Sequence, residues 1–200
     1  MKQHIYAALN SSQQMLTTFL ANDSNIQNIA DAAELLIATL ANGNRIYSCG
    51  NGGSMSDAMH FAEELSGRYR KNRKGLSATA ISDPGHITCV ANDYGYEFIF
   101  SRYLEAHAKP GDCLVAISTS GQSKNVLKAT EYAQNNGMKI LSLTGRAESP
   151  LGQMVDIDLC AGASDFADRV QEIHIKIIHI LLELVERKFF PENYSCSDII

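Results

Sequence analysis

A histidine and a glutamate four residues apart are the first candidates for chemistry in this sequence. His60 and Glu64 lie in a segment whose apolar spacing predicts a helix, so both side chains fall on one face of it. An imidazole and a carboxylate at this spacing can share a metal ion or a substrate. A solvated helix face that carries a chance histidine is the alternative. The mostly apolar neighbours favour a packed helix: Ala58, Met59, Phe61, Ala62 and Leu65.

The last predicted helix carries a second group of polar side chains among isoleucines: Asp168, Gln171, His174 and His179. A histidine in an apolar helix is more often a hydrogen-bonded core residue than a metal ligand. Gln171 and His179 are eight residues apart, about 12 Å along a helix axis. Gln171 and His179 can therefore bind the same ion only if one of the bonds is long or if the two residues come from different subunits.

Two loops between predicted strands and helices could bind an anion. Residues 48–54 contain three glycines, which let the backbone approach a ligand closely before a helix begins. Met55 stands where a dinucleotide-binding fingerprint has its third glycine, and the Gly-Lys-Ser/Thr of a P-loop does not follow. Residues 118–123 hold four hydroxyls, which suit the phosphate of a small metabolite when combined with free backbone N–H groups. A tight turn and a helix-capping turn are the respective alternatives.

A third loop, residues 91–95, places Asn92 and Asp93 beside a turn signal. Short polar side chains of this kind can form hydrogen bonds with sugar hydroxyls. On the residues alone, however, an Asx-turn is the preferred interpretation.

These candidates need elements to hold them, and after residue 42 the chain alternates short β-rich runs with helical patterns. Such alternation indicates a parallel sheet covered by helices on both faces, with ligands at the carboxyl ends of its strands. The predicted strands are residues 45–49, 76–81, 113–118, 139–144 and 157–160. The predicted helices are residues 54–66, 98–108, 123–136, 150–155 and 165–189.

The first 40 residues read as two further helices, with Asn25 as the N-cap of the second and Asn42-Gly43 as its end. The last helix is apolar on more than one face, which one 200-residue chain covers poorly, so we expect subunits to associate. We expect a single domain over residues 1–200. Its parts are the N-terminal helices over 1–42, the sheet core and last helix over 43–190, and a fraying tail over 191–200.

The composition disfavours several classes of protein. With 17 basic and 22 acidic residues the net charge is −5, which argues against a nucleic-acid binder and against an anionic membrane surface as partner. No segment approaches the roughly 20 apolar residues of a membrane helix, and no signal peptide is recognisable. Five scattered cysteines without a CxxC pair indicate reduced thiols. We therefore expect a cytoplasmic protein.

Several of these segments together resemble the phosphoheptose isomerases, which are sugar-isomerase (SIS) domain enzymes. The resemblance runs from about residue 26 to residue 186. It implies a flavodoxin-like α/β fold with a five-stranded parallel sheet between helices, and a homotetramer with one zinc ion per subunit. The motifs occur in the same order: SCGNGGS at 48–54, DAMHFAEEL at 57–65, AND at 91–93, ISTSG at 117–121 and QEIHIK at 171–176.

The activity that the resemblance implies is the aldose–ketose isomerisation of sedoheptulose 7-phosphate to D-glycero-D-manno-heptose 7-phosphate. This is the first step toward the ADP-heptose of the bacterial lipopolysaccharide core. By motif, Glu64 is the base, His179 is its acid–base partner, and the zinc ligands are His60, Glu64, Gln171 and His179. The implied substrate contacts are Asn51, Gly52, Gly53, Glu64, Asn92, Asp93, Ser118, Thr119, Ser120, Ser123 and Gln171.

The competing class is a SIS-domain protein without catalysis, either a sensor of sugar phosphates or a partner of the bacterial replication initiator. Isomerisation needs a base that takes a proton beside a carbonyl, and a partly buried carboxylate suits that task. Because Glu64 and His179 are both present, the sequence favours the enzyme.

Overall fold

The computed structural model describes residues 1–194, and five parallel strands form its sheet in the order β2-β1-β3-β4-β5. All five predicted strands are confirmed, although the first two are shorter than predicted. Ile46 of β1 pairs with Cys113 of β3 on one side and with Ala78 of β2 on the other. The bounds are β1 Ile46–Cys49, β2 Ala78–Ala80, β3 Cys113–Ser118, β4 Lys139–Thr144 and β5 Ile157–Cys160.

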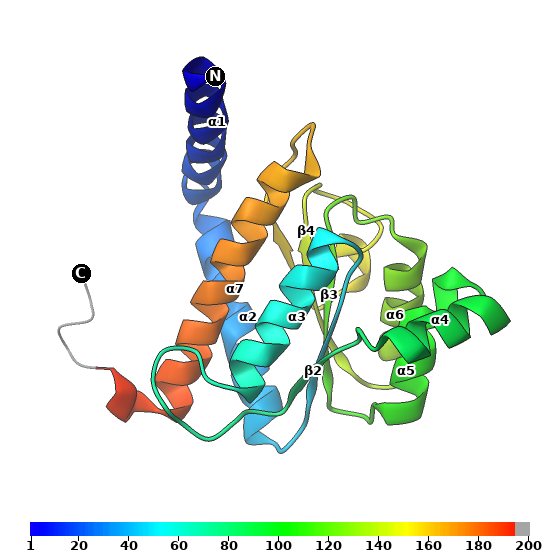
Figure 1. Cartoon of the computed structure of the whole chain (residues 1–200). Helices are drawn as coiled ribbons and strands as arrows, with labels where there is room; N and C mark the ends of the chain where they lie inside the picture. The colour runs from blue at the N-terminus through cyan, green and yellow to red at the C-terminus, as the bar shows by residue number, and fades with distance from the viewer. Residues whose placement is uncertain (195–200) are drawn as a thin grey trace.

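Helices cover both faces of this sheet, as the strand–helix alternation predicts (Figure 1). Helices α2, α3 and α7 lie on one face, and α4, α5 and α6 lie on the other. The α-helices are α1 Lys2–Leu20, α2 Asp23–Ala41, α3 Gly53–Ser66, α4 Pro84–Asp93, α5 Ile99–His107, α6 Lys124–Asn135 and α7 Ala167–Phe189. Three short 3-10 helices are η1 Tyr96–Phe98, η2 Gly152–Met154 and η3 Pro191–Asn193.

Two local predictions were wrong, and one helix was not predicted. The N-cap of α2 is Asn22, whose side chain accepts from Ser24 N, whereas Asn25 lies inside the helix. The predicted helix over 150–155 is only the turn η2, because Val155 is already extended toward β5. Helix α4 was not predicted, although Asp83 caps it and Pro84 opens it, both ordinary start signals.

Part of the predicted tail is ordered. Residues 191–193 form η3, and Tyr194 is in contact with α7 through its hydroxyl. The prediction of fraying for residues 195–200 lies outside the described residues.

Most of the apolar surface of α7 is covered within the chain itself, although Ile180 is 44% exposed. Ile173, Ile177 and Leu181 are buried against a core shared with α1, α2, α3 and the sheet. The reason is that neighbouring helices and the sheet contact this helix on several sides, so most of its apolar surface is covered without a partner subunit.

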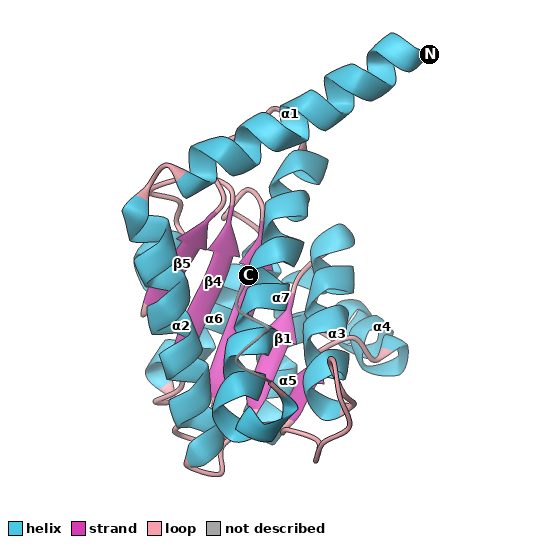
Figure 2. Cartoon of the chain, turned by 90° about the vertical axis from the view of Figure 1, so that its left-hand side faces the viewer, coloured by secondary structure: helices cyan, strands magenta, loops and turns pink. Residues whose placement is uncertain are grey.

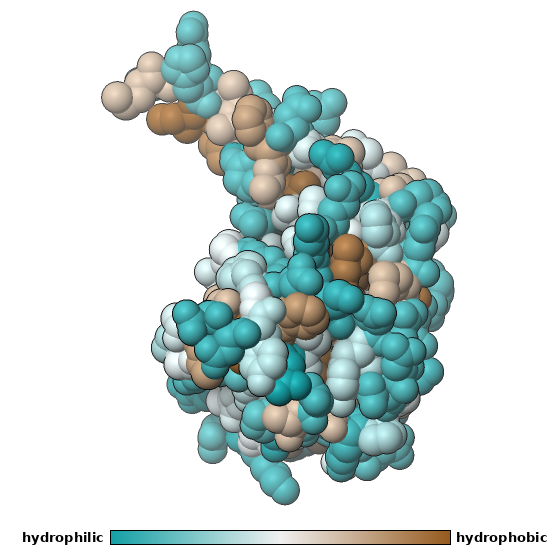
Figure 3. Space-filling view, turned by 90° about the vertical axis from the view of Figure 1, so that its right-hand side faces the viewer, coloured by the Kyte–Doolittle hydropathy of each residue, from teal (hydrophilic) through white to brown (hydrophobic). Residues whose placement is uncertain are grey.

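A group of exposed apolar side chains lies on α1, which projects from the body of the molecule (Figure 2). Ile5 and Leu9 are 53% and 63% exposed, and Met1 and Tyr6 are exposed beside them. The space-filling view shows brown, apolar patches along the projecting helix (Figure 3). Such a group of exposed apolar side chains on one projecting helix is typical of an interaction surface.

Two further features follow from the described residues. None of the helices formed by residues 1–194 is both long and apolar enough to cross a membrane. Four of the five cysteines, Cys49, Cys89, Cys113 and Cys160, are free of disulfide bonds, and Cys196 lies outside the described residues.

His174 ties α7 to the sheet and makes the fold sensitive to acid. Its side chain is fully buried, with Nε2 at 2.9 Å from the carbonyl oxygen of Thr144. Burial lowers the pKa of His174 to about 4. The unfolded chain therefore binds a proton near pH 6.5 while the folded chain does not, so the contribution of this residue is complete above pH 6.5 and is lost as the pH falls toward 4.

We expect His174 alone to remove about 2 kcal/mol of unfolding free energy between pH 7.5 and pH 5. His174→Gln keeps a donor for the Thr144 carbonyl but does not titrate, so its stability should fall less over this range. Urea unfolding of both proteins at the two pH values measures the difference. An equal loss in both proteins would contradict the assignment.

Candidate active site

The carboxyl ends of β1 and β3 are where the chain changes direction across the sheet. β1 is followed by β2 on one side, and β3 is followed by β4 on the other. In open parallel sheets, ligands bind at such a switch point, because the two loops that leave it diverge and leave a crevice. The loops are residues 50–53 and 119–123, the two that the sequence predicted to bind an anion.

The first loop needs glycine for conformation and for space. Gly52 has φ +57°, in the left-handed region that favours glycine. A Cβ on Gly50 would lie 2.6 Å from the carbonyl oxygen of Ser54, and one on Gly53 would lie 2.6 Å from Nε2 of Gln171. The loop therefore turns tightly into α3 and packs against the side chain of Gln171.

The second loop gathers its hydroxyls at the start of α6. Ser118 Oγ lies 3.0 Å from Ser123 Oγ and 3.5 Å from Ser120 Oγ. Gly121 takes φ +63° and lets the chain turn at this point. Hydroxyl donors and the first backbone N–H groups of a helix converge here, which is the chemistry of an anion site without a basic side chain.

A pair of asparagines joins the two loops. Asn51 and Asn125 exchange two hydrogen bonds of 2.9 and 2.8 Å, and the Tyr96 hydroxyl donates to Asn51 Oδ1 at 3.0 Å. These bonds border a cavity of about 410 Å³ that is lined in part by Asn51, Tyr96 and Ser123. Asn125 was not among the predicted site residues. The only indication of its role in the sequence is its place two residues after Ser123, in the first turn of a predicted helix.

Asn92 and Asp93 end helix α4 instead of forming the predicted Asx-turn. Both are exposed, and Asn92 donates to Asp93 Oδ1 at 2.8 Å. Within residues 1–194 neither forms a hydrogen bond to the two loops. The structure therefore shows no hydrogen bond between this pair and the other predicted substrate residues among the described residues.

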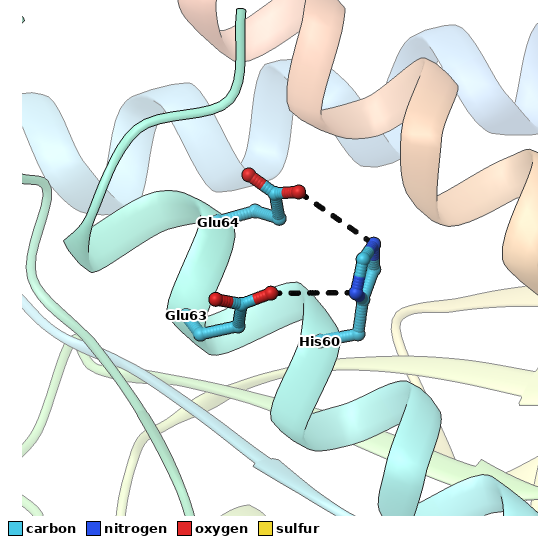
Figure 4. Close-up of side chains that lie close together, drawn as sticks. All are labelled: His60, Glu63 and Glu64. Atoms are coloured by element: carbon cyan, nitrogen blue, oxygen red, sulfur yellow. Dashed lines mark ion pairs between the residues drawn. The ribbon is translucent and has the colours of Figure 1, made fainter. Parts of the chain in front are cut away.

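The predicted acid, base and metal residues meet where α3 packs against α7. His60 Nε2 lies 3.1 Å from His179 Nε2 and 3.8 Å from Glu64 Oε1. Figure 4 shows the carboxylates of Glu63 and Glu64 directed at the His60 ring, with Glu63 Oε1 at 3.4 Å from Nδ1. A cavity of about 580 Å³, lined by His60, Glu63 and residues of β2 such as Thr79, lies beside this cluster.

Burial and neighbouring charge set the protonation of this cluster. Burial, together with the charge of Glu63, raises the pKa of Glu64. Burial, together with the nearby His60, lowers the pKa of His179, which keeps its ring neutral. Asp57, one turn earlier on α3, has its pKa raised to about 6 by burial, and its Oδ2 has no partner among the described residues. Neither Asp57 nor Glu63 was among the predicted site residues.

Gln171 is the one predicted metal ligand that the structure places elsewhere. It contacts Gly53 at the start of α3, whereas His60 lies two turns farther along that helix. The separation of about 12 Å between Gln171 and His179 along α7 persists, because α7 is one continuous helix. Three of the four predicted ligands therefore meet within one chain.

The donor set fits a zinc ion. Zinc prefers imidazole nitrogen and carboxylate oxygen, and in a tetrahedral site with bonds of about 2.0–2.1 Å its ligand atoms are about 3.3 Å apart. The two Nε2 atoms of His60 and His179 are 3.1 Å apart, and Glu64 supplies the carboxylate. His60, Glu63 and Glu64 also place one ligand atom each within 4.8 Å of the others.

Three comparisons with known proteins agree on one family. A family model described as SIS domain matches residues 9–145. The phosphoheptose isomerase of Photorhabdus laumondii is 52% identical over 184 residues, which are 92% of this chain and 95% of the relative. The phosphoheptose isomerase of Glaesserella parasuis is 51% identical over 185 residues, with coverages of 92% and 96%. A solved phosphoheptose isomerase structure from Francisella tularensis has a TM-score of 0.87 at 35% identity, covering 92% of this chain and 97% of that one.

Proposed function

This chain belongs to the SIS domain family and to its phosphoheptose isomerases, and we propose that it converts sedoheptulose 7-phosphate to D-glycero-D-manno-heptose 7-phosphate. In that role it supplies the first step toward ADP-heptose for lipopolysaccharide. The observation that carries the proposal is the meeting of Glu64, His60 and His179 at the contact of α3 and α7. A sensor without catalysis would not need a carboxylate with a raised pKa at this point.

The reaction moves a carbonyl from C2 to C1 of an open-chain sugar. Glu64 takes a proton from C1 and returns it to C2, and the raised pKa of its carboxyl matches that exchange. His179 is neutral and moves a proton between the two sugar oxygens. Remote binding of the phosphate holds the chain of the sugar in register with these groups.

His60, Glu64 and His179 would hold one zinc ion per subunit, with Gln171 contributed through a long bond or by another subunit. When bound, zinc polarises the carbonyl and orients the diol. A ring nitrogen that binds a metal cannot carry a proton at the same time. His179 therefore cannot use Nε2 for both roles in any one state, and removal of the metal distinguishes the two roles.

Most of the other proposed substrate residues lie in the two loops. Ser118, Thr119, Ser120 and Ser123 hold the phosphate, and the backbone of Gly52 and Gly53 faces the sugar. Asn51 keeps the first loop beside the second through Asn125. Asn92 and Asp93 form no hydrogen bond to either loop within residues 1–194, and as exposed polar side chains they remain available to sugar hydroxyls.

Incubation with sedoheptulose 7-phosphate, followed by NMR of the product anomers, tests the proposed reaction. We expect Ser120→Ala to weaken substrate binding by about 1–3 kcal/mol, because a charge-assisted hydrogen bond is lost. The parent should use sedoheptulose without phosphate poorly, and the variant should lose little more with that sugar. An equal loss with both sugars would show that Ser120 acts elsewhere.

We propose further that the protein is a cytoplasmic homotetramer that associates through α1. The support is the exposed apolar side chains of this projecting helix, which otherwise contact water. Closed symmetry favours a tetramer over an open chain of subunits.

Sedimentation near four times 21.9 kDa is expected for the parent, independent of concentration in the micromolar range. Ile5→Asp with Leu9→Asp should reduce this mass, because carboxylates would have to be buried in the interface. Asn10→Asp, an exposed polar position on the same helix, is the control and should leave the mass unchanged. A parent that sediments as a monomer at full activity would contradict the assembly.

A further inference from the structure

A buried ion pair lies behind the cluster of Glu64, His60 and His179. Arg73 belongs to the segment between α3 and β2, and Glu186 belongs to the last part of α7. Both side chains are only 1% exposed, and Arg73 Nε donates to Glu186 Oε1 at 2.7 Å. The predicted site residues did not include either of them.

Arg73 closes the end of the helix that carries Glu64. Its Nη2 donates to the carbonyl oxygen of Glu64 at 2.6 Å, and its Nη1 donates to those of Leu65 and Gly67 at 2.7 and 3.0 Å. The last carbonyls of a helix have no partner within the helix, and the negative end of its dipole favours a cation. One guanidinium therefore fixes the final turn of α3, including the backbone of Glu64 itself.

Glu186 fixes the same guanidinium to α7. It lies seven residues, two helical turns, beyond His179, and it also accepts from the Tyr194 hydroxyl at 2.7 Å and from Tyr69 N at 3.4 Å. The carboxylate is thus held from several sides. The chain of contacts runs from the Glu64 backbone through Arg73 to Glu186, and so from one site helix to the other.

We propose that Arg73 and Glu186 are positioning residues, which set Glu64 on α3 against His179 on α7. This inference rests on the proposed function of those two groups. A buried ion pair is a poor way to gain stability, since an apolar pair of similar volume often stabilises a fold as well. What an apolar pair cannot supply is the set of N–H donors that hold the Glu64 carbonyl in place.

The double variant Arg73→Met with Glu186→Leu separates positioning from stability. We expect a folded protein with a melting temperature lower by a few degrees, because three carbonyl oxygens lose their donor, a kcat lower by about 10- to 100-fold, and a KM changed by no more than about threefold. We also expect the affinity for Zn²⁺, measured by competition with a chromophoric chelator, to fall by about 10- to 100-fold. Arg102→Met with Glu105→Leu removes an exposed ion pair on α5 in the same way and should change none of these values.

Arg73→Lys covers the case in which the double variant does not fold. It keeps the charge and the partner but loses most of the donors to carbonyls, so we expect a folded protein with kcat lower by about tenfold. A folded variant of either kind with the kcat and Zn²⁺ affinity of the parent would overturn the positioning role. A parent inactive on sedoheptulose 7-phosphate overturns the proposed function instead, and Zn²⁺ affinity then decides the positioning role. A parent that neither turns over this sugar nor binds Zn²⁺ overturns both.

Discussion

Glu64→Gln is expected to lower kcat by at least ~10³-fold, about 4 kcal/mol of barrier, while the protein stays folded. Glutamine keeps the volume and polarity of the side chain but cannot take a proton from carbon. The position is half-buried, and burial raises the pKa of the Glu64 carboxyl, so the change removes a group suited to proton exchange. The rate of heptose 7-phosphate formation by NMR, with circular dichroism on the same sample, measures the effect.

Glu63→Gln is the matched control for this variant. Glu63 is the preceding residue, also faces His60, and is 67% exposed. Its substitution removes the same charge from the same ring but leaves the Glu64 carboxylate in place. We expect activity within a few-fold of the parent. More than a tenth of the parent's activity in Glu64→Gln, or an equal loss in the two variants, would remove Glu64 from the role of base.

Removal of zinc is expected to lower kcat by about 10²- to 10³-fold, with recovery when Zn²⁺ is added back. His60→Gln should behave like the chelated parent and should not recover, since one imidazole ligand is missing. Metal content by mass spectrometry, with activity before chelation, after chelation and after addition of Zn²⁺, measures this.

The same measurement separates the two roles proposed for His179. If His179 acts mainly as a metal ligand, His179→Gln and chelation should cause similar losses that do not add. If it mainly moves protons, the chelated parent should still exceed the His179→Gln variant. Full activity in the parent after complete removal of metal would contradict the zinc proposal.

The strands were predictable because each is a short apolar run that alternates between the two faces of a buried sheet. In β3, Val115 and Ile117 face one core while Leu114 and Ala116 face the other. Helix α4 escaped prediction because its apolar spacing is weak and only Val90 is buried on it, so its existence depends on its capping residues. The helix predicted over residues 150–155 was wrong for the opposite reason. Its helical pattern of apolar residues continues past the point where the chain extends into β5.

The site was predictable as a set of motifs but not as a geometry. His60 and Glu64 follow from spacing on one helix, whereas His60 and His179 are 119 residues apart and meet only because α3 packs on α7. Arg73 carries no local signal of function, and Asn125 has only its place near Ser123, because the roles of both depend on contacts with residues remote in the chain. Spacing along the sequence cannot show which residues a packed pair of helices brings together.

The order of the strands also governs how the molecule gains its activity as it folds. Within residues 1–194, every pair of neighbouring strands is parallel, so none is joined by a hairpin. The Asn51–Asn125 bond closes 74 residues of chain, and such a closure loses entropy before its contacts form. Helices form within about a microsecond, long before β1 pairs with β3. Recovery of catalysis therefore marks the end of folding, whereas recovery of helical signal marks its beginning.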